Sequence, residues 1–129
     1  QTFTGSTAAI DASITILSQL KNNKYLGESG KIKLLSTYFR DGLESLSRQY
    51  PTLIQGPFGV ESMMAFTAYD GSIERSKSFV QQLFKNGVIG FIAGKDPVRC
   101  RFLMPIGSVK KEDITQVLHI IERTLIQLK

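Results

Sequence analysis

Two arginines alternate with apolar residues along the short segment 98–103 (VRCRFL). In an extended strand, side chains two residues apart point to the same side, so Arg99 and Arg101 share one face, away from Phe102. A planar guanidinium can hold a carboxylate through two parallel hydrogen bonds. The residues alone leave two interpretations open, a strand face with two solvated arginines, which is the commoner case, or a carboxylate-binding site.

The opening segment, residues 2–7 (TFTGST), is the second place where a ligand could bind. Its hydroxyl groups and glycine lead directly into a segment with helical apolar spacing. At a helix N-terminus, free backbone N–H groups and the helix dipole favour an anion, and hydroxyl donors can complete a phosphate site. The alternative is that the Ser and Thr side chains only cap the helix.

Other catalytic chemistry has little support. The sequence contains no phosphate-binding loop, dinucleotide-binding glycine pattern, zinc-protease motif or nucleophile elbow. His119 is the only histidine and has no visible partner, so we expect it to be structural or at the surface. Cys100, the only cysteine, is expected to be a buried strand residue, and its lack of a disulfide partner fits a reducing cytoplasm. We therefore predict no metal site and no catalytic residue in this chain.

The charge distribution and the lack of a long apolar run argue against two classes of partner. The net charge is +5, but lysines and arginines are spread over the whole length and most have acidic residues nearby. This favours a solvated surface over a nucleic-acid site. No apolar run approaches the roughly 20 residues that span a bilayer, so we expect no membrane partner.

The apolar spacing predicts four helices and several short strands, in the order helix, helix, strand, helix, two paired strands, helix. The helices are expected at 7–20, 32–50 and 73–84 and after Ser108 as an N-cap, and the extended segments at 53–55, 60–69, 88–92 and 98–103. Both faces of segment 60–69 are apolar, so we expect it to be central and covered on two sides. The order predicts a single α+β domain with helices on a largely antiparallel sheet.

Taken together in this order, four segments resemble the C-terminal end of the class-III (ω-amino acid) pyridoxal-phosphate aminotransferases. Residues 2–6 (TFTGS) are similar to the family's Thr-Phe-x-Gly-Asn, 56–60 (GPFGV) to its Gly-x-Gly-Leu, 84–88 (FKNGV) to its helix end followed by Gly-Val, and 101–106 (RFLMPI) to its Arg-x-x-Pro-Pro-Leu. The departures are Ser6 for asparagine, Thr7 for proline and Met104 for the first proline of the pair.

The resemblance implies a role for two residues. Arg101 would hold the substrate's α-carboxylate, and Thr2 would reach the cofactor phosphate of the other subunit in a homodimer. Arg99 has no counterpart role and is expected to be a solvated surface residue. Residues 1–22 would be a linking segment and helix, and residues 23–129 the C-terminal small domain of a fold-type-I enzyme.

The resemblance also implies what this chain lacks. The family's cofactor-binding lysine belongs to a large domain, which would precede Gln1. The intact cytoplasmic protein would transfer an amino group between an amino acid or ω-amine and a keto acid. We expect this chain alone neither to bind pyridoxal phosphate tightly nor to transaminate. The alternative is a free-standing α+β module that binds a small anion or has a regulatory role.

Overall fold

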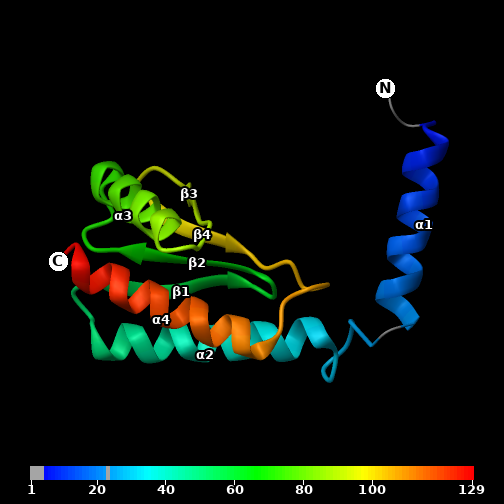
Figure 1. The fold of residues 1–129 in the computed structure, drawn as a ribbon, viewed down its shortest axis with the longest axis horizontal. Coiled ribbons are helices and arrows are strands. Elements are labelled where there is room, and N and C mark those ends of the chain that lie inside the picture. Colours follow the sequence, from blue (N-terminus) through cyan, green and yellow to red (C-terminus); the bar gives the residue numbers. More distant parts are fainter. Residues whose placement is uncertain (1–4, 23) are drawn as a thin grey trace.

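The computed structural model of the chain describes residues 5–22 and 24–129. They form four helices and a four-stranded antiparallel sheet (Figure 1), which confirms the predicted α+β class. The elements are α1 (Thr7–Asn22), α2 (Lys31–Gln49), β1 (Ile54–Val60), β2 (Met63–Ala68), α3 (Ile73–Lys85), β3 (Phe91–Ala93), β4 (Arg99–Leu103) and α4 (Lys111–Gln127).

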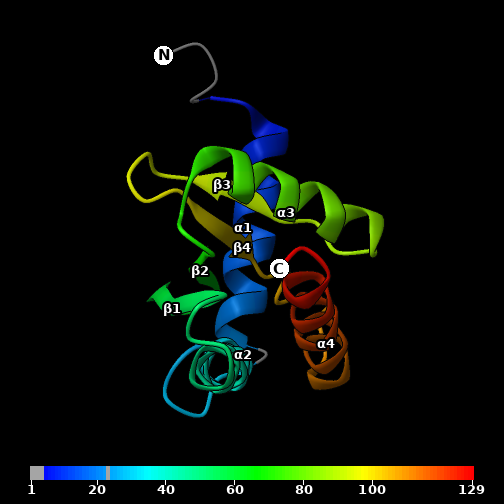
Figure 2. The same ribbon diagram turned by 90° about the vertical axis from the view of Figure 1, so that its left-hand side faces the viewer.

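The strands lie in the order β1-β2-β4-β3, so β2 is central, as predicted. Figure 2 shows α2, α3 and α4 on one side of the sheet. We call the helix-free side the outer face; it consists of Gln55, Phe58, Val60, Met63, Ala65, Thr67, Phe91, Ala93, Arg99, Arg101 and Leu103. The expectation that both faces of β2 are covered is met only in part within the described residues, because on the outer face Met63 is 46% exposed whereas Thr67 is 3% exposed.

An aromatic cluster on the helix side holds β4 in place. Phe102 of β4 stacks on Phe66 of β2 at a centroid distance of 5.7 Å, and Phe39 of α2 meets Phe102 edge-on at 6.0 Å. Phe79 of α3 meets Phe66 edge-on at 5.7 Å. Edge-on and offset pairs of this kind stabilise a core beyond their buried area. Because Phe102 is fixed on the helix side, strand alternation directs Arg101 to the outer face.

The first hairpin differs from the prediction of one strand over residues 60–69. The chain turns at Glu61 and Ser62, and Glu61 has a left-handed φ of 48°. Gly56 and Pro57, which looked like a break between strands, lie inside β1, where the register with β2 shifts. β1 is an edge strand, so a proline without an N–H and a bulge are both tolerated there.

Two other boundaries also differ. α4 begins at Lys111 rather than after Ser108, because the Asp113 carboxylate accepts a hydrogen bond of 2.8 Å from the backbone N–H of Lys110. The Ser108 hydroxyl instead donates to the carbonyl of Pro105. The strand expected at 88–92 is shorter and later, at Phe91–Ala93.

Helix α1 stands apart from the rest of the chain (Figure 1). None of its residues is buried, and its apolar stripe, which includes Ile10, Ile14 and Leu17, is exposed. A helix of this composition is expected to need tertiary packing for stability. Within residues 5–22 and 24–129, no helix is long and apolar enough to cross a membrane.

Candidate carboxylate-binding site

Arg101 lies in a row of four residues that crosses the outer face of the sheet. Phe58 of β1 faces Ala65 of β2, Ala65 faces Arg101 of β4, and Arg101 faces Phe91 of β3. The Arg101 side chain is exposed and forms no hydrogen bond or ion pair within residues 5–22 and 24–129. The small methyl group of Ala65 beside it leaves open space, so the guanidinium is accessible to a ligand.

Arg99 adopts a more defined position than a solvated surface arginine. Its guanidinium carbon lies 4.0 Å from the centroid of the Phe58 ring. Phe58 is on β1, so the side chain of Arg99 crosses over β2 to reach it. The residue is half-buried, and its Nε atom is buried without a hydrogen-bond partner in the described chain. The expectation of a fully solvated Arg99 is therefore wrong.

Two neutral polar residues lie near Arg99 on the outer face. Gln55 of β1 faces Thr67 of β2. The register between β2 and β4, in which Ala65 faces Arg101 and Phe66 faces Cys100, places Thr67 opposite Arg99 when it is continued by one residue. Thr67 is buried, at 3% exposed, whereas Gln55 is exposed, so the Gln55 amide and the two guanidiniums are the groups that can offer N–H donors to a ligand. This combination is suited to binding an anion with planar oxygens, such as a carboxylate.

The surroundings of the two arginines are apolar and exposed. Phe91 is 54% exposed, Leu103 is 67% exposed, and Val60 and Met63 are also open to solvent. A surface that covers this patch would lower the local dielectric and strengthen any charge pair formed there. In the described chain alone the site is open to water.

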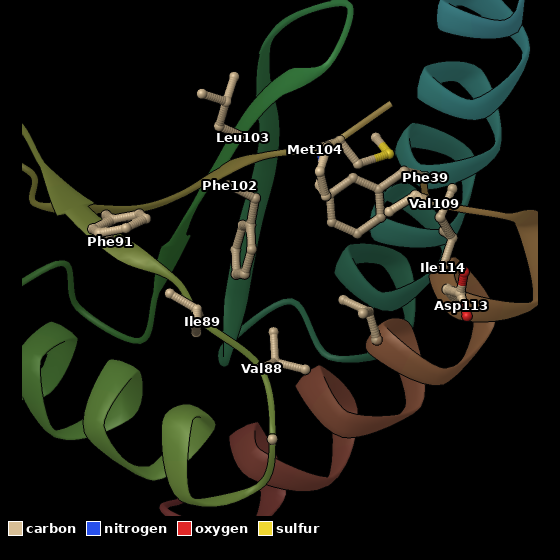
Figure 3. Close-up of a pocket in the computed structure, with 13 residues that line it drawn as sticks. Phe39, Val88, Ile89, Phe91, Phe102, Leu103, Met104, Val109, Asp113 and Ile114 are labelled. Atoms are coloured by element: carbon tan, nitrogen blue, oxygen red, sulfur yellow. The ribbon is translucent and has the colours of Figure 1, made fainter. Parts of the chain in front are cut away.

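A separate cavity of about 420 Å³ lies mainly on the helix side of the sheet (Figure 3). It is formed by the first half of α4, the end of β4 and the segment before β3, and Phe39, Val88, Phe102 and Ile114 line it. Its lining is almost entirely apolar. The one carboxylate, from Asp113, already accepts the hydrogen bond that caps α4. The cavity therefore offers no charged donor to a carboxylate and is distinct from the arginine site.

The other residues singled out in the sequence take no part in the arginine site. Cys100 is buried on the helix side of β4, and burial raises the pKa of its thiol to about 12, which keeps it protonated and unreactive. His119 is exposed on α4. Cys100 is therefore the buried strand residue that we predicted, and His119 lies at the surface. Thr2 lies outside the described residues, so its phosphate role stays a prediction.

The described lysines do not fit a site for pyridoxal phosphate. A lysine activated for covalent catalysis is desolvated or placed beside another charge. No lysine within residues 5–22 and 24–129 is buried. Lys31 donates a hydrogen bond of 3.3 Å to the carbonyl of Gly107, and the Lys111 ammonium lies 4.5 Å from the centroid of the Tyr38 ring. These are surface contacts of structural lysines.

Solved aminotransferases have the same fold. The chain superimposes on the M. tuberculosis lysine aminotransferase with a TM-score of 0.75 at 22% identity, covering 88% of this chain and 24% of that one. The Toxoplasma gondii ornithine aminotransferase superimposes with a TM-score of 0.74 at 19% identity, and the match covers 93% of this chain and 27% of that one. A transaminase from the marine bacterium Virgibacillus superimposes with a TM-score of 0.81 at 12% identity, and the match covers 98% of this chain and 31% of that one.

No protein-family profile matches the sequence, and no curated protein matches it either. The likeness is therefore one of structure. The chain spans about a quarter to a third of the length of these aminotransferases. Its four helices and antiparallel sheet have the fold of the aminotransferase C-terminal domain.

Proposed function

We propose that this chain is the C-terminal part of a class-III pyridoxal-phosphate aminotransferase and that Arg101 binds the α-carboxylate of its substrate. The observation that carries the proposal is the guanidinium of Arg101, which has no hydrogen-bond or ion-pair partner among residues 5–22 and 24–129 and lies on the helix-free face of a sheet with the aminotransferase fold. The intact enzyme would transfer an amino group between an amino acid or ω-amine and a keto acid.

The position of Arg101 suits this role. A guanidinium binds a carboxylate through two parallel hydrogen bonds, which fixes the orientation of the carboxylate as well as its place. Backbone pairing on both sides, to Ala65 and Phe91, holds the base of the side chain. A substrate held by its carboxylate would present its reacting carbon in a defined direction, and orientation of this kind lowers the barrier of the reaction.

The remaining parts of the active site would come from outside this chain. In the proposal, residues 1–22 form the linking segment and helix, and residues 23–129 form the small domain. Thr2 contributes to the cofactor phosphate site of the partner subunit in a cytoplasmic homodimer. The exposed apolar stripe of α1 and the exposed apolar outer face support docking against a larger body. The chain alone would neither hold the cofactor tightly nor transaminate.

The first experiment is to capture the native polypeptide from its source with an antibody raised to this chain. We expect a product several times larger than 14.4 kDa that releases pyridoxal phosphate on acid treatment. A native product of 14.4 kDa without cofactor would contradict the proposal and favour a free-standing module that binds a small anion.

The role of Arg101 is tested in that native protein with the variant Arg101→Gln. Because hydrogen bonds to a charged group contribute about 1.5–3 kcal/mol, we expect KM for the amino donor to rise about 10- to 100-fold. Arg48→Gln is the matched control, since Arg48 is an exposed arginine whose only ion pair is a 4.0 Å contact with Glu44. Equal KM values for both variants would exclude Arg101 from carboxylate binding.

A further inference from the structure

We propose that a small pocket between α2 and the turn of the first hairpin binds inorganic phosphate, and that Glu61 in this turn selects phosphate over sulfate. Arg99 and Arg101 do not line this pocket. The proposal goes beyond the aminotransferase function and does not depend on it.

The pocket is built from one face of a helix and one hairpin. Helix α2 runs along the edge strand β1, as Figures 1 and 2 show. Residues three and four apart on a helix share a face, and this spacing brings four polar residues of α2 to the pocket. They are Lys33, Ser36, Thr37 and Arg40, and Val60, Glu61 and Met64 of the hairpin complete the lining. The volume is about 180 Å³, below the roughly 300–1,000 Å³ of pockets for larger organic ligands, so it suits a small ion.

The first observation is a pair of positive charges without a negative partner. The one ion pair among residues 5–22 and 24–129 joins Arg48 to Glu44. Lys33 is half-buried and forms no hydrogen bond or ion pair in that part of the chain. Arg40 is half-buried as well. Two positive charges on one helix face attract an anion that lies between them.

The second observation is that the Arg40 guanidinium is held in place. It donates a hydrogen bond of 2.6 Å to the carbonyl of Gly59. Gly59 has a φ of 107°, and a side chain at this position would collide with the carbonyl of Met63, so the hairpin requires glycine there. A guanidinium has several N–H donors, and the one used by Gly59 leaves others for a ligand. A donor already held in position loses little freedom when a ligand binds.

The third observation is a buried hydroxyl group without a partner. Ser36 is 3% exposed, and its Oγ atom has no hydrogen-bond partner among the described residues. Such a group carries a desolvation cost, which a bound oxygen atom removes. Lys33 lies one turn before Ser36, and its long, unpaired side chain can move aside as a ligand enters. Ser36 therefore provides a donor at the bottom of the pocket.

The fourth observation is the one carboxylate of the lining. Glu61 is exposed in the turn and forms an ion pair with neither Lys33 nor Arg40. A carboxylate repels an anion unless the anion has a hydrogen to donate to it. Hydrogen phosphate has bare oxygens for the ammonium, guanidinium and hydroxyl groups, and one O–H for Glu61. Sulfate has bare oxygens but no O–H, so the pocket distinguishes the two anions.

The test is a titration of the 129-residue chain with phosphate and with sulfate at constant ionic strength, followed by amide NMR shifts. At about pH 8, above the second pKa of phosphate, both anions carry about two negative charges and only phosphate retains a hydrogen. We expect saturable shifts around Ser36, Gly59 and Glu61 with phosphate. Sulfate should bind about tenfold more weakly, the increment of one hydrogen bond to a charged group. Methyl phosphate, whose dianion lacks the O–H, should bind as weakly as sulfate, which distinguishes free phosphate from a phosphate ester.

Glu61→Gln removes the negative charge and should reduce the preference to about twofold or less, mainly by strengthening the binding of sulfate. Glu44→Gln is the matched control, because Glu44 is a partly exposed glutamate of α2 that does not line the pocket. It should retain the tenfold preference.

Ser36→Ala tests the buried donor. It should weaken phosphate binding about fivefold, because it removes one hydrogen bond to the anion. The urea midpoint of the free chain should stay the same or rise, since the Ser36 hydroxyl has no partner to lose. A purely structural Ser36 would leave the phosphate affinity unchanged.

The other outcomes contradict the proposal at separate points. Equal binding of phosphate and sulfate, or a preference that survives in Glu61→Gln, would overturn the selective role of Glu61. Loss of the preference in Glu44→Gln as much as in Glu61→Gln would reveal an effect of net charge alone. No saturable shift in the millimolar range with either anion would overturn the site, and tighter binding of glycine than of phosphate would assign the pocket to a zwitterion instead.

Discussion

The contact between Arg99 and Phe58 can be measured directly as a coupling free energy. Replacing Phe58 with Leu retains an apolar side chain on the edge strand but removes the ring that lies 4.0 Å from the Arg99 guanidinium. Phe58 is only partly covered, at 36% exposed. A cation–π contact in a partly solvated position contributes about 0.5–1 kcal/mol. We therefore expect a coupling of about 0.5–1 kcal/mol between the two residues.

The assay is a double-mutant cycle in urea unfolding, with the variants Phe58→Leu, Arg99→Gln and the double variant. The cycle is needed because Arg99→Gln also removes a buried Nε without a partner, and its single effect therefore combines a lost contact with a relieved cost. A second cycle between Phe58→Leu and Lys111→Gln is the control. Lys111 lies over a different ring, that of Tyr38, so its coupling to Phe58 should be close to zero.

A coupling below about 0.3 kcal/mol, within the error of additivity, would refute the reasoning. It would mean that Arg99 rests on Phe58 without a favourable interaction, so that its guanidinium is not held in place.

Three further predictions concern the framework that presents the site. Phe102→Ala removes the ring shared by the aromatic cluster and should lower the free energy of unfolding by about 3–5 kcal/mol in urea titrations; a loss below 1 kcal/mol would be inconsistent with that packing. Asp113→Ala should lower the free energy of unfolding by about 1 kcal/mol at the melting temperature, because it removes the carboxylate that caps α4. Ser108→Ala should lower it by less than about 0.5 kcal/mol. The reverse order in thermal unfolding would contradict the observed helix start. Burial raises the pKa of both Tyr69 and Cys100 to about 12, from 10.0 and 9.0, so the unfolded chain ionises first. Stability should be fully present below about pH 9 and fall as the pH rises toward 12, and a urea midpoint unchanged between about pH 8 and about pH 10.5 would exclude this linkage.

Helices α2, α3 and α4 were predictable from the sequence because each buries one apolar stripe. The spacing over residues 32–50 anticipated α2, and the helix expected at 73–84 is α3. The Ser72 hydroxyl caps α3 by accepting a hydrogen bond from the backbone N–H of Arg75. The start of α4 was missed because serine is a favoured N-cap residue and lysine is not. The sequence did carry a signal for the later start, since Asp113 lies three residues after Lys110, whereas Lys111 lies three residues after Ser108.

The first hairpin was not predictable by the same reasoning. Glu61 and Ser62 lack the glycine or asparagine that usually marks a two-residue turn, yet Glu61 adopts a left-handed conformation there. Gly56 and Pro57 carry a strong turn signature but lie inside an edge strand. Local composition was therefore misleading at both places, because pairing with β2 outweighed it.

The misplaced first hairpin also limited what could be predicted of the arginine site. Alternation along one strand was sufficient to place Arg99 and Arg101 on a common face, opposite to Phe102, and the structure confirms this. The contact of Arg99 with Phe58 depends on the register of three strands, and with the turn misplaced that register could not be derived. Side-chain contacts across non-adjacent strands have no periodic signal in the sequence.

The two edges of the sheet affect how the protein can associate without aggregating. Along β1, Pro57 removes a backbone donor and the bulge interrupts the ladder, while β3 is only three residues long. Both edges are therefore poor templates for strand addition, which is a common route to misassembly of sheet proteins. Although its apolar outer face is exposed, the chain is disposed to join another surface face to face rather than to extend its sheet into a fibre.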